Sequence, residues 1–263
     1  MFMDRNNIEK IGKTQEEKLL LAKLWDKIDA GMRRNVPAST CFLSPYEQSL
    51  AQFLFGQAEG LHAFGGYEDA ERKMLVYLPD YLEEKALYEE QSPVVCLQAQ
   101  FYHGDSPGHR DFLGALIGSG ISRENIGDIC VGEGKCIFFV TQAVAPFLLD
   151  SFTQAGRTRV HLSQLPLEGV AVPEPEIKEI RDTVASLRLD SIVSSGFRIS
   201  RGIAADCIAA SRVCINGVLC EKPDKPVPEN AKISVRGYGK IRLAGIGGET
   251  KKGRISITIH QYV

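Results

Sequence analysis

The sequence predicts an α+β protein of several domains: a small N-terminal α/β region, a ferredoxin-like βαββαβ middle domain and a C-terminal helix–helix–hairpin module. Three observations support this fold class. Helical and strand-like spacings of apolar residues follow one another along the 263 residues. One segment is stiffened by three prolines, and basic residues concentrate after it. The expected parts are 1–80 for the N-terminal domain, 81–165 for the middle domain, 166–182 for a proline-rich connector and 183–263 for the C-terminal module.

The first eighty residues have the pattern of a small α/β domain. Thr14 and Glu17 stand at the spacing of a capping box, which predicts an amphipathic helix over 14–30. Pro45 suits the first turn of a second helix that ends near Phe55. The expected short strands are 39–43, 61–64 and 74–78.

The middle segment has the order strand, helix, strand, strand, helix, strand. These elements are expected at 94–102, 110–117, 126–131, 136–141, 144–155 and 158–162. This order is the ferredoxin-like arrangement, which many RNA-recognition folds share. The aromatic strand motif of a standard RNA-recognition module is reduced here to Phe138-Phe139. At most one of these two rings could stack on a base, because adjacent side chains of a strand face opposite ways.

The C-terminal module begins with a predicted short helix. Asp190 or Ser191 can cap its first turn by accepting a hydrogen bond from a free amide. Its buried face is expected to hold Leu189, Ile192 and Val193. Gly196 is expected to end the helix with a positive φ.

A second helix and a hairpin follow. Ser200 can cap this helix, whose expected buried stripe is Ile203, Ala204, Cys207 and Ile208. Asn216-Gly217 then lies between two apolar runs, which is the strongest short-range signal for a two-residue hairpin turn.

The charge of the chain is distributed unevenly. The net charge is −2, yet from Thr183 onward there are 13 Lys/Arg against 6 Asp/Glu. The preceding residues carry 18 Lys/Arg against 27 Asp/Glu. This segregation indicates a basic contact module joined to an acidic body. The alternative is a set of scattered, solvated lysines.

Composition is that of an ordinary soluble protein, with 44% hydrophobic and 24% charged residues. The seven cysteines form no CxxC pair, which predicts reduced core thiols in a cytoplasmic protein and no zinc site. We expect no signal peptide, because the first 30 residues are charged throughout. We expect no membrane span, because no apolar run approaches ~20 residues.

The C-terminal pattern resembles the S-four-type RNA-binding domain, the αL motif named after a small-subunit ribosomal protein. The matching residues are Arg188-Leu189-Asp190, Ile199-Ser200-Arg201, Ala204, Val213, Ile215-Asn216-Gly217 and Lys222-Pro223. One residue departs from the pattern: Ser211 stands where that domain usually has Gly at the end of the second helix.

The whole chain resembles the YlmH-type RNA-binding protein family. The segments that carry this resemblance are 65–73, 108–129, 183–190 and 236–245, with the following Lys251-Lys252. The resemblance implies a ribosome-associated RNA-binding protein without a cofactor. It also implies a link to the rescue of large ribosomal subunits that carry peptidyl-tRNA; the family was earlier linked to cell division.

The candidate RNA-binding residues are polar or charged residues of the C-terminal module that are not expected to belong to its buried core. They are Arg188, Arg198, Ser200, Arg201, Arg212 and Lys222. Further candidates for RNA contact are Arg110, Arg123, Lys240, Arg242, Lys251 and Lys252. Arginine binds phosphate with two donors or stacks on a base, and a helix N-terminus such as that at Ser200 attracts phosphate. The alternative for Arg188 is a surface ion pair with Asp190 or Asp206.

We expect non-enzymatic binding of structured ribosomal RNA or tRNA, by a monomeric protein that associates with the large ribosomal subunit. The alternative is an RNA-modifying enzyme, such as a pseudouridine synthase or an rRNA methyltransferase. Arg188-Leu189-Asp190 resembles the catalytic tripeptide of pseudouridine synthases, but only 73 residues follow Asp190, too few for that catalytic domain. A third possibility is a scaffold whose acidic front half recruits protein partners. We assign no catalytic residue and no metal ligand.

Overall fold

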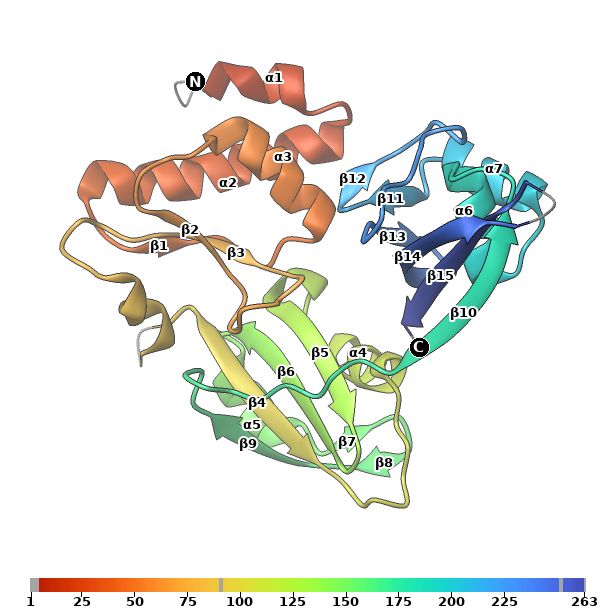
Figure 1. Ribbon diagram of the computed structural model, residues 1–263. Coiled ribbons are helices and arrows are strands. Elements are labelled where there is room, and N and C mark those ends of the chain that lie inside the picture. The colour runs from red at the N-terminus through yellow and green to blue at the C-terminus, as the bar shows by residue number, and fades with distance from the viewer. Residues whose placement is uncertain (1–4, 90–91, 251–252, 263) are drawn as a thin grey trace. The chain divides into compact units, whose positions relative to one another are not determined.

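The computed structural model describes residues 5–89, 92–250 and 253–262 (Figure 1). The chain divides into two compact units, Met1–Glu174 and Pro175–Val263, here called the first and the second unit. Both mix helices and strands, which confirms the predicted α+β class.

The first unit begins with helices over a small sheet. Its elements are η1 (Arg5–Asn7), α1 (Ile8–Ile11), α2 (Gln15–Arg34), β1 (Ala38–Ser39), α3 (Pro45–Phe55), β2 (Leu61–Phe64) and β3 (Met74–Tyr77). The capping box is present, because Thr14 Oγ1 accepts from the Glu17 amide while the Glu17 carboxylate accepts from the Thr14 amide. The strands pair antiparallel in the order β1-β3-β2.

Strand β1 is shorter than the sequence suggests. Only Ala38 and Ser39 pair with β3 as a strand. The chain then turns away from this sheet, because the Phe42 amide donates to the Glu124 carbonyl (2.8 Å). Leu43 returns for a single bridge to Lys73.

The rest of the first unit is the ferredoxin-like part. Its elements are η2 (Glu84–Tyr88), β4 (Val94–Gln100), α4 (His109–Gly118), η3 (Arg123–Asn125), β5 (Ile126–Gly132), β6 (Lys135–Thr141), α5 (Ala145–Ser151), β7 (Gln154–Ala155), β8 (Thr158–Arg159) and β9 (His161–Leu165). The sheet has the antiparallel order β5-β6-β4-β9, the βαββαβ topology that the sequence predicts. Helix α5 ends earlier than expected, because residues 154–155 pair with 158–159 and move the last strand to 161–165.

The ferredoxin-like sheet is buried on both faces. One face packs with α4 and α5 through a cluster that includes Leu97 and Phe138. The other face packs with the small sheet through a cluster that includes Cys96, Phe139 and Met74. Helices α2 and α3 cover the far side of the small sheet (Figure 1). The parts expected at 1–80 and 81–165 therefore share a core and form one compact unit.

The second unit is a six-stranded antiparallel sheet with two helices on one face. Its elements are β10 (Ile177–Val184), α6 (Leu189–Phe197), α7 (Arg201–Ala209), β11 (Val213–Ile215), β12 (Val218–Leu219), β13 (Lys232–Val235), β14 (Gly239–Glu249) and β15 (Ile255–Tyr262). The strand order is β10-β15-β14-β13-β11-β12. The core between helices and sheet includes Leu189, Ile192, Ile208, Leu243 and Ile259.

The expected connector at 166–182 is wrong in its last part. Residues 177–184 form β10, which pairs with β15 along its whole length. Ile180 and Val184 point into the core, so apolar burial and strand pairing order this stretch in spite of the prolines before it.

The first turn of α6 also differs from the prediction. Neither Asp190 nor Ser191 caps the helix, which begins at Leu189. The amides of Leu189 and Asp190 instead donate to the carbonyls of Lys225 and Pro223 (2.9 and 3.0 Å). The first turn is thus satisfied by a loop that is distant in sequence.

Gly196 does not end α6. The residue with a positive φ is Arg198 (54°), whereas Gly196 lies inside the helix. A Cβ on Gly196 would come within 2.5 Å of the Ile241 side chain, so glycine is needed here for close packing on the sheet.

Helix α7 begins as predicted, because Ser200 Oγ accepts from the Ile203 amide (3.2 Å). Ile203 itself is 44% exposed and does not belong to the buried stripe. Ser211 has a φ of 56°, a left-handed conformation that glycine adopts at lower cost.

Candidate nucleic-acid interface

A buried carboxylate holds two of the predicted arginines together. Arg188 Nε and Nη2 donate to the two oxygens of Asp190 (3.2 Å each), and Arg201 Nη2 donates to Oδ2 (2.8 Å). The Asp190 side chain is 8% exposed, while those of Arg188 and Arg201 are 42% and 56% exposed. Two positive charges therefore share one negative charge, and a net positive charge remains at the surface.

Asp190 holds the two arginines in place, and these hydrogen bonds use only some of the N–H donors of each guanidinium. A guanidinium has five N–H groups, of which Arg188 uses two and Arg201 one in these bonds. Burial alone would raise the pKa of Asp190, but the hydrogen bonds and charges of the two arginines outweigh burial and lower it. Asp190 therefore stays ionised at neutral pH. Its carboxylate is an anchor for side chains, which argues against the catalytic role considered from the tripeptide.

A small cleft lies beside this anchor. Its lining residues are Asp182, Thr183, Val184, Ala185, Ser191, Ser194, Ser195, Arg198, Arg201 and Arg254. Arg254 is held by hydrogen bonds to the side chain and carbonyl of Thr183. Three guanidiniums and one carboxylate, together with serine hydroxyls, give a polar surface that suits phosphate oxygens. Arg198 and Arg201 are among the candidate RNA-binding residues of the sequence analysis, and the fold brings Arg254 to the same cleft.

Lys222 lies near the same end of α6. The carbonyl of the next residue, Pro223, accepts from the Asp190 amide, so the segment after the hairpin runs beside the buried anchor. Lys222 is exposed, and among the described residues it forms no ion pair. Contact of Lys222 with RNA stays a prediction.

Arg212 has a different environment. Its Nη2 donates to the Arg236 carbonyl (2.6 Å), and its guanidinium carbon lies 5.9 Å from the centre of the Tyr238 ring. The Tyr238 ring lies 5.8 Å from that of Phe197, the last residue of α6. The sequence analysis did not single out Tyr238 or Arg236.

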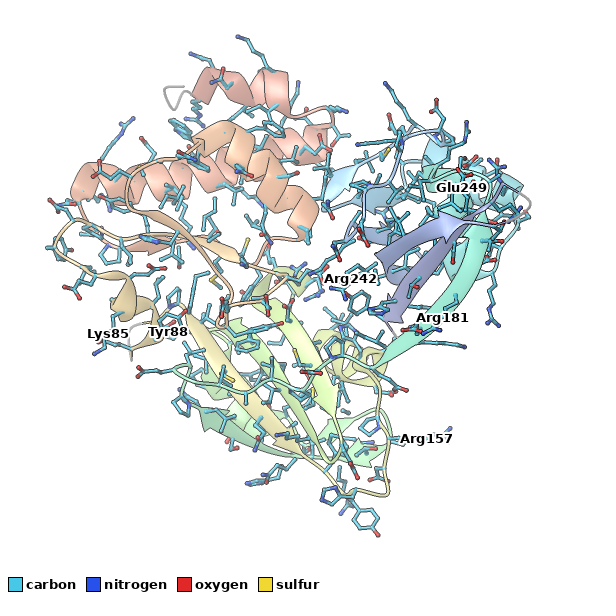
Figure 2. All side chains as sticks on the ribbon, viewed as in Figure 1. Lys85, Tyr88, Arg157, Arg181, Arg242 and Glu249 are labelled. Atoms are coloured by element: carbon cyan, nitrogen blue, oxygen red, sulfur yellow. The ribbon has the colours of Figure 1, made fainter. Side chains whose placement is uncertain are left out.

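The further candidates of the second unit lie on the sheet. Arg242 on β14 (labelled in Figure 2) contacts His260 Nδ1 (3.1 Å), its cross-strand partner. Lys240 lies 5.6 Å over the Tyr262 ring, and burial lowers its pKa to about 8. These residues alternate with core residues such as Ile241, so they face away from α6 and α7 and do not extend the cleft. The candidates Lys251 and Lys252 lie outside the described residues.

In the first unit, Arg123 is engaged internally. Its Nη1 donates to the carbonyls of Ile126 and Gly127 (2.7 and 3.3 Å). Burial lowers its pKa to about 10. Arg110 is exposed on the first turn of α4. Burial and the nearby charges of Arg123 and Arg110 lower the pKa of His109, so these three basic residues lie close together.

The expected base-stacking ring of the middle domain is not available. Phe138 and Phe139 are both fully buried, on opposite faces of the sheet. Tyr67 stacks on Phe139 with ring centres 5.0 Å apart, and its hydroxyl donates to Asp128 (2.9 Å). The side chain of Asp128 also accepts from the amides of Glu71 and Arg72. The 65–73 segment is therefore bound to the ferredoxin-like sheet, and core packing is its role.

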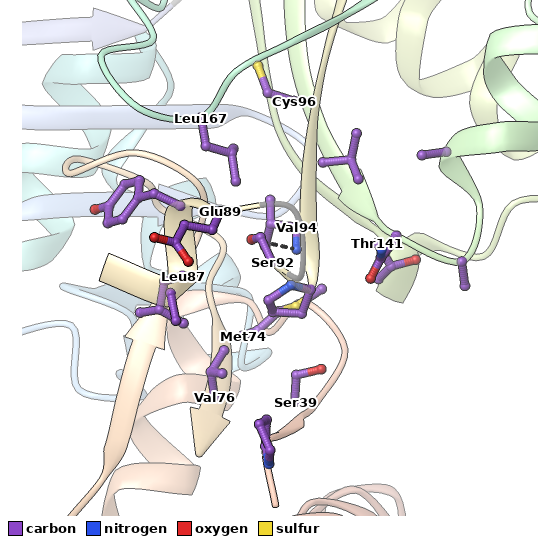
Figure 3. Close-up of a pocket in the computed structure, with 18 of the residues that line it drawn as sticks. Ser39, Met74, Val76, Leu87, Glu89, Ser92, Val94, Cys96, Thr141 and Leu167 are labelled. Atoms are coloured by element: carbon purple, nitrogen blue, oxygen red, sulfur yellow. Dashed lines mark hydrogen bonds between the residues drawn. The ribbon is translucent and has the colours of Figure 1, made fainter. Parts of the chain in front are cut away.

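The first unit contains a wide concavity. Most of its lining residues are apolar, among them Met74, Val76 and Leu87, and polar residues such as Ser39, Glu89 and Thr141 also line it (Figure 3). Its cysteines are poor nucleophiles, because burial raises the pKa of Cys96 to about 12 and also raises that of Cys41.

Within the described ranges, no group of three or more His, Cys, Asp or Glu is placed to hold a metal ion. In those ranges, too, every helix is too short or too polar to cross a membrane.

Comparison with known proteins agrees with this division of the chain. The family described as "Putative RNA-binding domain in YlmH" matches residues 105–169, and the S4 domain, the S-four-type module of the sequence analysis, matches residues 187–233. "Ribosome-associated protein quality control protein P2" of Bacillus subtilis (strain 168) is 35% identical over 224 residues, which cover 84% of this chain and 86% of that protein.

Among solved structures, "Cell division protein ylmH from Streptococcus pneumoniae" matches with a TM-score of 0.48 and 22% identity, covering 61% of this chain and 98% of its own. The sequence similarity to the Bacillus subtilis protein extends over most of both chains, and the two family matches fall in the first and second units. The chain therefore belongs to the YlmH family, with an S4 domain in its second unit.

Proposed function

We propose that this protein binds structured ribosomal RNA or tRNA through its second unit and acts without catalysis, as a ribosome-associated factor. The observation that carries this proposal is the group of guanidiniums around Asp190 and the adjoining cleft. Arg188, Arg198, Arg201 and Arg254 all belong to this group. They are referred to below as the arginine group.

The charge of the two units supports a polyanionic partner. The residues from Thr183 onward carry 13 basic and 6 acidic side chains, whereas the remainder is acidic. Binding that neutralises phosphates releases counterions, so the affinity should fall as the salt concentration rises. Recognition would depend on RNA shape and on unpaired regions, because side chains cannot read the deep major groove of an RNA helix.

The finer proposal is a role at large ribosomal subunits that carry peptidyl-tRNA, in a cytoplasmic, monomeric protein. The name of the Bacillus subtilis relative, with its reference to ribosome-associated quality control, supports the ribosomal part. The resemblance to the family supports the peptidyl-tRNA part. The first unit would then position the S4 domain on the particle, since Arg123 and the aromatic rings of its sheet are engaged internally.

The test is co-sedimentation of the full chain with purified large ribosomal subunits. Arg198→Gln/Lys222→Gln removes two basic side chains that form no ion pair among the described residues, so Asp190 keeps both of its partners. Arg157→Gln/Arg159→Gln is the matched control, because it removes the same charge from exposed positions in the first unit. We expect the first variant to bind at least about 10-fold more weakly, since charge-assisted hydrogen bonds each contribute roughly 1.5–3 kcal/mol. The control should bind as wild type. Equal binding by both variants and wild type would refute the assigned surface.

A further inference from the structure

The turn between β13 and β14 presents an exposed aromatic side chain. Tyr238 is 37% exposed, although it lies in a turn that is otherwise polar. Its amide donates to the Val235 carbonyl (3.0 Å), and the glycines on either side have φ values of 90° and 115°. Such positive φ angles close the turn tightly and hold the tyrosine at its tip.

The guanidinium of Arg212 packs against this turn. Arg212 Nη2 donates to the Arg236 carbonyl (2.6 Å) and the guanidinium lies over the Tyr238 ring. A Cβ on Gly237 would come within 2.9 Å of Arg212 Nη2, so the absence of a side chain there leaves room for the arginine. Arg212 uses one N–H in this bond, and a guanidinium plane can stack on an aromatic ring.

The turn also contacts the last residue of α6. Phe197 lies against Tyr238 with an interplanar angle of 52°, and the next residue is Arg198 of the cleft. Arg236 adds another exposed positive charge. An exposed aromatic ring and a guanidinium that packs over it thus lie together at this turn.

We propose that Tyr238 and Arg212 form a stacking site for an unpaired nucleobase of the bound RNA. This inference rests on the proposed function, which supplies the RNA. Unpaired bases stack on tyrosine rings and arginine planes, whereas bases inside a helix have no free face. The site would make the protein prefer RNA helices interrupted by a bulged or looped nucleotide.

The experiment compares two RNAs that bind the full-length protein. One is a blunt duplex of about 16 base pairs; the other is the same duplex with one bulged nucleotide, replaced by a fluorescent adenine analogue. Wild type should bind the bulged RNA about 10-fold more tightly, as expected for one stacked base. Binding should quench the analogue.

Three variants decide the result. Tyr238→Leu should bind the duplex like wild type but lose both the preference and the quenching. Tyr238→Phe should keep both, because it retains a ring that can stack. Tyr102→Leu is the matched control, since Tyr102 is an aromatic that is 76% exposed in the first unit, and it should behave as wild type.

The outcomes separate the two proposals. Preference and quenching that persist in Tyr238→Leu, or a wild type that binds both RNAs equally, would overturn the stacking site and leave the phosphate contacts standing. A wild type that binds neither RNA and also fails to co-sediment with large ribosomal subunits would overturn the proposed function itself.

Discussion

Asp190 determines how the arginine group is organised. It is the acceptor for Arg188 and Arg201, and its carboxylate is nearly inaccessible to solvent. Loss of either arginine would leave a buried carboxylate with one partner fewer, which is why alanine substitutions there mix a binding effect with a stability effect. Arg198 and Lys222 are cleaner probes of RNA contact.

The titration of Asp190 tests this anchor. Its pKa in the folded protein is lowered by the two arginines against the effect of burial. Because the folded value lies below the unfolded value of ~3.9, the stabilisation is present above about pH 4 and is lost as the pH falls through the folded pKa. A carboxyl-carbon NMR titration should therefore give a midpoint below ~3.9. In Arg201→Gln the midpoint should move up; a midpoint that is identical in both proteins would contradict the pairing.

Sequence alone could predict part of the anchor. The pairing of Arg188 with Asp190 is one of the alternatives that spacing leaves open, since the residues are two apart. The second partner, Arg201, could not be foreseen, because its approach depends on how α7 folds back on α6. Tyr238 was missed, although an aromatic between two glycines after a strand is a signal for an exposed ring.

At the scale of elements, Gly196 illustrates how α6 is seated on the sheet. Gly196→Ala should destabilise the second unit by about 1–3 kcal/mol, because its Cβ would overlap the Ile241 side chain. Gly202→Ala in α7 is the matched control, since its Cβ would meet nothing closer than Ser200 Oγ at 3.8 Å. That change should be neutral or stabilising, as alanine is the better helix former. Hydrogen exchange of peptides from residues 189–197 measures both effects, and equal protection in the two variants would contradict the packing argument.

Asp128 has a comparable role in the first unit. It accepts hydrogen bonds from the Tyr67 hydroxyl and from two backbone amides of the 65–73 segment. Asp128→Ala would leave these partly buried donors without their acceptor and should cost roughly 1–3 kcal/mol in the free energy of unfolding. Urea titration followed by the fluorescence of Trp25, the single tryptophan, reports on this unit. Asp69→Ala in the same segment is exposed and should change the midpoint little; a loss as large as that of Asp128→Ala would reject the assignment.

The order of elements was predictable where local patterns are strong. The βαββαβ order follows from apolar spacing, and the two predicted helices of the N-terminal part follow from a capping box and a first-turn proline; these elements are confirmed. Strand β10 was missed because prolines before it dominate the local pattern, while its partner β15 lies more than seventy residues later in the sequence. Pairing over such a separation leaves no local signal.

At the scale of the whole molecule, charge and folding units coincide. The acidic residues dominate the first unit and the basic residues the second, so the electrostatic surface for RNA was foreseeable from counting alone. The shared core of the two N-terminal parts could not be foreseen, because its cluster is assembled from residues as distant in the sequence as Phe42 and Phe139. The same burial removes the sheet surface on which an RNA-recognition fold could stack bases.

The salt dependence of RNA binding tests the central claim most directly. If Arg188, Arg198, Arg201 and Arg254 each neutralise one phosphate, the logarithm of the binding constant should fall against the logarithm of salt concentration with a slope of about −3. Arg198→Gln should reduce the magnitude of that slope by about 1, while Arg157→Gln should leave it unchanged. A slope near zero for the wild-type protein, or the same slope in Arg198→Gln, would contradict the claim that these guanidiniums form one phosphate-binding surface.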